Sequence, residues 1–342
     1  MKKQLIAAAV AASMSAVAMA DVSITGNANY EYFHKTDGGS AGDVTSNYGD
    51  TEVNISIKGK SGDTSVVANL ELDEAADAGT SGKGIDVEDL YISTKIGDVS
   101  VKAGDYASGT TALGGEIDEG GRATNKVALS TKVGPATVGY ATSNSSSSGT
   151  TFDNDSSSVS LSMPIAGMKL SVKEQSDSYT LVGLSGTQGG VNFRLENKDA
   201  DASNSDVFFY QVGTKMGDLS VSVEGIDADA AGKVTETDSS IFAQEMATVV
   251  SGTSTGRSNV DGVQQITLGT SIDGTAITLK AGSLKGTAGY QDADFMRVEA
   301  KRPLASGATL TVSYDDYDDA GVATSGTMYD TQLVEIDLSV KF

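Results

Sequence analysis

The chain has 342 residues, with no cysteine, no tryptophan and a single histidine, and its 46 acidic and 24 basic residues give a formal net charge of −22. Without cysteine there can be no disulfide, no thiolate zinc site and no thiol nucleophile, and one histidine leaves little for histidine-based catalysis. A strongly acidic chain repels the phosphates of nucleic acids and favours cations as partners. We therefore expect no nucleic-acid partner.

The first twenty residues have the three parts of a secretory signal peptide. Met1-Lys2-Lys3 supplies positive charge, residues 5–12 form an apolar core, and Ala18-Met19-Ala20 is a small-residue cleavage site. We predict that residues 1–20 are a signal peptide and that residues 21–342 form one exported domain. No later stretch approaches the roughly 18 uninterrupted apolar residues of a transmembrane helix, so any membrane crossing must be made by strands.

Apolar and polar residues alternate along most of the remaining chain, as in residues 22–33, and helical spacing is weak and confined to residues 241–250. Each alternating run has one apolar and one wet face. The pattern predicts eighteen strands, at residues 22–33, 50–60, 65–72, 85–96, 98–104, 125–133, 136–142, 158–165, 168–174, 178–185, 190–197, 205–215, 218–226, 262–272, 275–283, 292–302, 308–314 and 331–342.

Short connections alternate with longer ones between these strands. The longer ones include residues 35–50, 73–84, 105–124, 142–157, 227–261 and 315–330. Compact turns at one rim and long loops at the other are typical of outer-membrane barrels. A soluble β-sandwich does not alternate short and long connections so strictly, and a solenoid needs a fixed sequence repeat, which this chain lacks. We predict an all-β fold, a transmembrane antiparallel β-barrel of 16 to 18 strands.

The last strand carries Val334, Ile336, Leu338, Val340 and Phe342 on one face, so the chain closes on an aromatic residue. From the opening at residues 21–26, through residues 87–92 and the hairpin at 97–104, to Lys341-Phe342, the chain resembles the general porins of Gram-negative outer membranes. Candidates for aromatic girdles at the membrane interfaces are Tyr30, Tyr32, Tyr91, Tyr140, Phe193, Phe208, Tyr210, Tyr314 and Phe342.

That resemblance implies a homotrimer in the cell outer membrane, in contact with lipid and lipopolysaccharide. It implies that Phe342 belongs to the signal recognised by the outer-membrane assembly machinery, and that the third long loop folds into the barrel as a constriction. It also implies sixteen strands, in which case the short hairpins within residues 168–197 are the ones expected to be lost.

The third long connection, residues 105–124, is rich in glycine and carries an acidic cluster of Glu116, Asp118 and Glu119. We predict that this loop folds into the lumen and narrows it, with Arg122 available to pair with the loop's own carboxylates. An exposed acidic surface loop is the alternative interpretation.

Lys58, Lys102 and Lys126 lie on the polar face of their alternating strands. We expect them to face the acidic cluster across the pore. Opposed charges at a constriction create a transverse field, and the acidic excess enriches cations. The alternative is that these lysines are ordinary solvated residues of the barrel wall.

The function predicted from these features is a water-filled channel for passive diffusion of small hydrophilic solutes and ions, with a mild cation preference and no enzymatic activity. Alternatives are a substrate-preferring channel of eighteen strands and a secreted, soluble, β-rich adhesin. No Ser/His/Asp arrangement can be proposed around His34. No cofactor is expected, although the acidic outer segment 315–319, with Asp227 and Asp229, is a candidate for calcium; a solvated acidic loop is the alternative.

Overall fold

The structure is a computed structural model that describes residues 21–37, 44–73, 84–106, 126–144, 155–201, 206–229, 260–286, 293–319 and 329–342. The predicted signal peptide lies outside these residues. The described part of the chain forms eighteen β-strands in one antiparallel sheet. They are β1 (Asp21–Asp37), β2 (Val44–Ser61), β3 (Thr64–Asp73), β4 (Gly84–Ile96), β5 (Val99–Asp105), β6 (Lys126–Val133), β7 (Ala136–Asn144), β8 (Asp155–Ile165), β9 (Met168–Gln175), β10 (Tyr179–Gln188), β11 (Val191–Ala200), β12 (Val207–Met216), β13 (Leu219–Ala228), β14 (Val260–Ile272), β15 (Thr275–Gly286), β16 (Ala293–Pro303), β17 (Ala308–Asp319) and β18 (Tyr329–Lys341).

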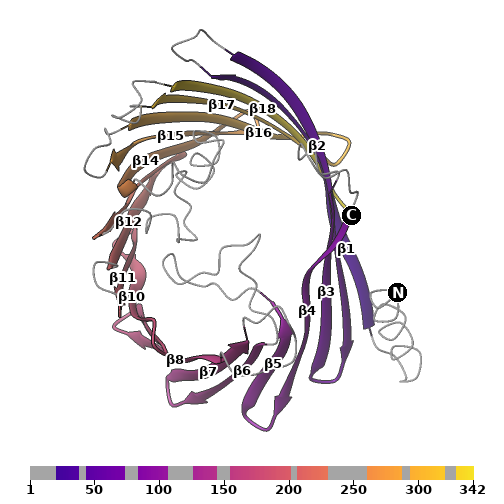
Figure 1. Cartoon of the computed structure of the whole chain (residues 1–342), viewed down its shortest axis with the longest axis vertical. Helices are drawn as coiled ribbons and strands as arrows, with labels where there is room; N and C mark the ends of the chain where they lie inside the picture. Colours follow the sequence, from indigo (N-terminus) through magenta and orange to yellow (C-terminus); the bar gives the residue numbers. More distant parts are fainter. Residues whose placement is uncertain are drawn as a thin grey trace.

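The sheet closes on itself because β1 pairs with β2 on one side and with β18 on the other. Viewed along the barrel, the strands form the wall of a ring around an opening (Figure 1). Beyond β18, the backbone N–H of Phe342 donates to the Gly26 carbonyl at 2.9 Å, and the Gly26 N–H donates back at 2.8 Å. A closed sheet has no unpaired edge, which is the condition for crossing a membrane with strands.

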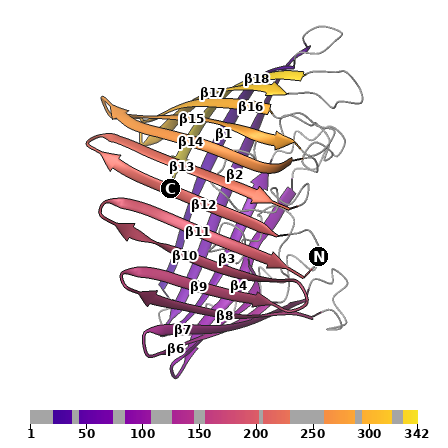
Figure 2. The same ribbon diagram turned by 90° about the vertical axis from the view of Figure 1, so that its left-hand side faces the viewer.

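Tight turns join the strands at one end of the barrel, where the hairpins line up in Figure 2. At Asp273-Gly274, between β14 and β15, both φ angles are positive, at 50° and 78°. Two left-handed residues in succession define the type I′ turn, whose twist matches that of the paired strands. The predicted alternation of short and longer connections is confirmed, because the antiparallel order places every second connection at this rim.

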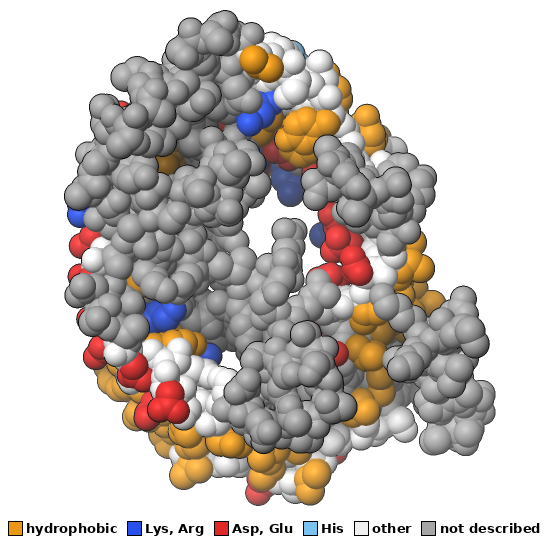
Figure 3. All heavy atoms as spheres, viewed as in Figure 1, with side chains coloured by type: hydrophobic (Ala, Val, Ile, Leu, Met, Phe, Trp, Pro, Cys, Tyr) orange, Lys and Arg blue, Asp and Glu red, His pale blue; other side chains and the backbone are white. Residues whose placement is uncertain are grey.

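The strands present an apolar face to the outside and a mainly polar face to the lumen. Ile24, Val223, Ile266 and Leu338 are large apolar residues with exposed side chains, and hydrophobic side chains follow the outer contour of the ring (Figure 3). Among the described residues, no helix is long and apolar enough to cross a membrane. An exposed apolar surface on a closed barrel is suited to contact with lipid.

The strand count is eighteen, so the sixteen strands implied by the resemblance are not observed. The hairpins within residues 168–197 are present as β9, β10 and β11. The wall is therefore wider than that of a sixteen-stranded barrel, since diameter grows with strand number.

The predicted loop at residues 35–50 is mostly strand, because β1 continues to Asp37 and β2 begins at Val44. Polar side chains there bond across the hairpin: the Tyr32 hydroxyl donates to Asn47 Oδ1 at 3.0 Å, and His34 Nδ1 lies 2.6 Å from the same oxygen. Pattern analysis missed this extension because polar residues on both faces erase the alternation on which it depends.

Candidate functional site on the inner wall

The strand register places all three predicted lysines on the inner face. Lys58 lies opposite Ser23 and Val67, Lys102 opposite Ser93 and Ala128, and Lys126 opposite Gly104. Their neighbours along each strand, such as the exposed Val127, face outward. Glu116, Asp118, Glu119 and Arg122 fall outside the described residues, so the pairing of these residues with the lysines across the lumen stays a prediction.

Lys102 and Lys126 converge on the aromatic ring of Tyr106, the residue directly after β5. Lys102 Nζ lies 3.7 Å from the centroid of that ring and 3.8 Å from the centroid of Tyr91, and Lys126 Nζ lies 5.2 Å from Tyr106. The two rings meet edge to face with centroids 5.6 Å apart, and Tyr106 is only 3% exposed. These contacts are favourable cation–π geometries. They hold Tyr106 on the lumen side of the wall.

Gly104 makes this cluster possible. Its φ is +135°, and a Cβ there would overlap the Leu90 carbonyl oxygen and lie 2.7 Å from the Tyr91 Cα. Only glycine fits so close to the neighbouring strand. The prediction that Tyr91 belongs to an outer aromatic girdle is wrong, because its register with Val67 and Gly104 places it on the inner face.

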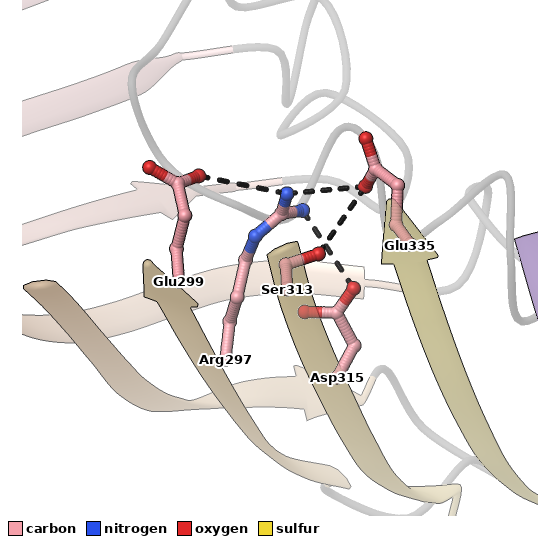
Figure 4. Close-up of polar contacts among 5 residues, drawn as sticks. All are labelled: Arg297, Glu299, Ser313, Asp315 and Glu335. Atoms are coloured by element: carbon pink, nitrogen blue, oxygen red, sulfur yellow. Dashed lines mark hydrogen bonds and ion pairs between the residues drawn. The ribbon is translucent and has the colours of Figure 1, made fainter. Parts of the chain in front are cut away.

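A second charged cluster surrounds Arg297 of β16 (Figure 4). Strand β16 lies across the ring from β5 and β6 (Figure 1). The guanidinium lies 3.2 Å from Glu335 Oε2, 3.6 Å from Asp315 Oδ2 and 3.7 Å from Glu299 Oε2. The Ser313 hydroxyl donates to the same Glu335 oxygen at 3.3 Å. One cation thus binds together three strands and is shared by three carboxylates.

Sequence analysis did not predict this cluster, because the carboxylates come from β16, β17 and β18 and only the register brings them together. The segment 315–319, predicted as an acidic outer loop, is part of β17. Consecutive residues of a strand face opposite sides, so Asp315 points inward whereas Asp316 points outward. The described residues contain no group of three or more histidine, cysteine or acidic side chains suited to a metal ion.

Inner-face charge is segregated around the ring. The strand register shows which side chains face the lumen. On the inner face, acidic side chains are the majority from β16 through β18 and on through β1 to β4, and basic side chains are the majority from β5 to β11. The acidic set is Glu299, Asp315, Glu335, Asp337, Asp21, Glu31, Asp50, Glu52, Glu71, Asp86 and Asp89, and it is interspersed with Arg297, Lys301, Lys341, Lys35, Lys58, Lys60 and Lys95. The basic set is Lys102, Lys126, Lys132, Lys169, Lys173, Arg194 and Lys198, with Glu196 among them. Acidic side chains line one edge of the opening in Figure 3, on the side of β1 to β4.

These two sectors lie on opposite sides of an eighteen-membered ring. The wall alone therefore supports a field across the lumen. Sequence analysis assigned the negative side of that field to the loop, whereas the strands supply a negative side of their own.

Comparison by sequence finds no matching family model and no matching curated protein. Comparison of structures finds outer-membrane barrels. OccK8 (OprE) of Pseudomonas aeruginosa matches with a TM-score of 0.62 and 9% identity over 93% of this chain and 98% of that chain. A BenF-like porin from Pseudomonas fluorescens has a TM-score of 0.57 and 12% identity over 93% and 99%. OccK2 (OpdF) of P. aeruginosa, solved in complex with glucuronate, has a TM-score of 0.59 and 12% identity over 94% and 98%.

At these identities the likeness is one of fold, and it extends over nearly the whole of each chain. The chain has the fold of Gram-negative outer-membrane porins, as an eighteen-stranded closed antiparallel barrel.

Proposed function

We propose that the protein is an outer-membrane porin that lets small hydrophilic solutes and ions diffuse passively through a water-filled lumen, with a mild preference for cations. The observation that carries this proposal is the closed barrel, apolar outside and charged inside. A barrel of this many strands is too wide for its wall side chains alone to fill. The apolar outer face disfavours the soluble adhesin, and no described feature favours a substrate-preferring channel or an enzyme.

The acidic excess of the chain and the acidic sector of the inner wall support the cation preference. The proposal includes export by residues 1–20, a homotrimer, lipid and lipopolysaccharide around the barrel, and recognition of Phe342 by the assembly machinery. Phe342 lies where β1 and β18 pair to close the sheet. This position suits a residue that the assembly machinery recognises while the barrel closes.

We further propose that residues 105–124 form the constriction, with Glu116, Asp118 and Glu119 facing Lys102 and Lys126. The position of Tyr106 supports this, because its ring packs on the inner-face residues Lys102 and Lys126 at the point where β5 ends. Opposed charges at a narrow point orient dipolar solutes and select ions.

The test is single-channel current in a planar bilayer under a salt gradient. The parent is compared with Glu116→Gln/Asp118→Asn/Glu119→Gln. Glu174→Gln is the control, since it removes a carboxylate from the outer face of β9. We expect cation-preferring channels whose preference falls in the triple variant and is unchanged in the control.

Two other results are informative. If the triple variant conducts and selects like the parent, the barrel stands and the constriction loop is refuted. If the parent opens no channels and stays soluble without detergent, the porin proposal itself is refuted.

A further inference from the structure

Lysine recurs at one rim of the barrel, where the tight turns join the strands (Figure 2). Seven strands carry a lysine within two residues of their turn-side end, and all seven side chains are exposed. They are Lys60 of β2, Lys95 of β4, Lys132 of β6, Lys169 of β9, Lys215 of β12, Lys301 of β16 and Lys341 of β18. We refer to these residues as the lysine ring.

All members of the lysine ring point into the lumen. Successive side chains of a strand alternate between its two faces, so a lysine beside an outward side chain points inward. Four of the lysines are adjacent to exposed apolar residues of the outer face, which are Ile96, Val133, Met216 and Val340. The other three share a face with inner-wall residues of the same strand, which are Lys58 on β2, Lys173 on β9 and Glu299 on β16. The lysine ring therefore lines the turn-side mouth of the lumen.

The inward direction separates these lysines from the lipid. Basic side chains near a membrane interface commonly extend their charge toward the headgroups. At the turn-side ends of the described strands, only Arg302 is a basic residue on the outward face. Ion pairs between described residues include no member of the lysine ring. Their charge therefore acts on ions in the water at this mouth.

Few acidic side chains lie beside the lysine ring. Asp21, opposite Lys60, is the one acidic residue within two residues of a turn-side end among the described strands. Four aspartates occupy the turns beyond the strand ends, and these are Asp63, Asp98, Asp218 and Asp273. The lysines outnumber these five acidic side chains. The turn-side rim is therefore net positive, although the whole chain has a formal charge of −22.

The carboxylates of the inner wall lie deeper in the barrel. Apart from Asp21, every inner-face acidic residue of the described strands is at least four residues from the turn-side end of its strand. The nearest are Glu299 on β16 and Asp337 on β18. Charge is therefore separated along the barrel axis as well as across it, and the acidic excess of the chain lies away from the turn-side mouth.

We propose that the lysine ring attracts anions to the turn-side mouth, so that the channel discriminates between cations and anions differently at its two ends. The ring follows the whole circumference, since neighbouring members are never more than four strands apart. A charged wall enriches counterions over about one Debye length, which is about 10 Å in 0.1 M salt and about 3 Å in 1 M salt. The proposal rests on the proposed channel function and names the residues that set selectivity at one end.

The test is the reversal potential of single channels between about 0.1 M and about 1 M KCl, with the gradient applied in both directions. The chain has no cysteine, so Pro135→Cys in the turn after β6 gives a single thiol that is biotinylated beforehand. Streptavidin added to one chamber then identifies the turn side. We expect the K⁺ to Cl⁻ permeability ratio to be at least about twofold lower when the dilute salt is on the turn side, where the lysines are least screened.

Neutralising four lysines tests their role directly. Lys95→Gln/Lys132→Gln/Lys169→Gln/Lys215→Gln should raise the K⁺ to Cl⁻ ratio by about twofold with dilute salt on the turn side, and leave it unchanged with the opposite gradient. Arginine at the same four positions keeps the charge and should preserve the parent values in both directions. Arg302→Gln removes a charge from the outward face of the same rim and should also match the parent.

The outcomes separate this proposal from the channel function. Equal permeability ratios for the two gradient directions in the parent overturn the role of the lysine ring and leave the channel in place. A quadruple glutamine variant with the parent's values in both directions does the same. A parent that opens no channels refutes the channel function and, with it, the role of the ring.

Discussion

Replacing Arg297 by methionine removes the cation that three carboxylates share on the inner wall. The guanidinium lies 3.2 to 3.7 Å from carboxylate oxygens of Glu335, Asp315 and Glu299, and the Arg297 side chain is only 11% exposed. Asp315 itself is 2% exposed, so it cannot regain solvent without local opening. The substitution nearly conserves side-chain volume but leaves negative charges on three adjacent strands facing one another.

The size of the effect follows from these distances. At an effective dielectric constant of about 20, each attraction is worth about 4 to 5 kcal/mol before the cost of desolvation. Because desolvation offsets much of this, the net loss on removing one partner of a buried ion pair is about 3 to 5 kcal/mol. We expect Arg297→Met to lower the free energy of unfolding by that amount. Arg297→Lys should recover less than half, because an ammonium cannot present the same fork of donors.

The assay is guanidinium-induced unfolding of the barrel in phospholipid vesicles. Unfolding free energies are compared only between variants whose free energy of unfolding falls with denaturant concentration at the same slope. Arg302→Met is the matched control, since Arg302 is exposed on the outer parity of the same strand, and it should change stability by less than about 1 kcal/mol. Arg297→Met/Asp315→Leu should be more stable than the single variant. If Arg297→Met falls within about 1 kcal/mol of the parent, the cluster is not an energetic unit.

Three further predictions test the wall and its closure. Gly104→Ala should lower the free energy of unfolding by about 2 kcal/mol or more, because the added Cβ overlaps the Leu90 carbonyl oxygen and disturbs the pairing of β4 with β5. A variant as stable as the parent would contradict that geometry. On β13, Val223→Arg should lower the free energy of unfolding by about 2 to 4 kcal/mol, because Val223 faces lipid, whereas Ser222→Arg should be nearly neutral, because Ser222 faces the lumen. Equal unfolding midpoints for the two variants in vesicles would exclude membrane insertion. Phe342→Ala should lower the yield of folded, heat-modifiable barrel in the membrane fraction, and an unchanged yield would remove the assembly role.

Pattern analysis predicted most of the wall. Alternation in runs such as residues 22–33 and 331–342 marked strands with one apolar face, and the placement of Lys102 and Lys126 on the polar parity agrees with the observed register. Alternation succeeds here because lipid and water impose opposite demands on successive residues of one strand. It failed at residues 35–50 and 315–319, where the strands carry polar residues on both faces.

The sequence by itself determined that the chain is built of amphipathic strands joined by alternating short and longer connections, since both properties are local. Only the tertiary structure decided the strand number, the clustering of three carboxylates on Arg297 and the packing of Tyr106 on two lysines. Each of these depends on which strands become neighbours and in what register. That information arises when a sheet closes, because closure brings together residues whose separation along the chain carries no periodic signal.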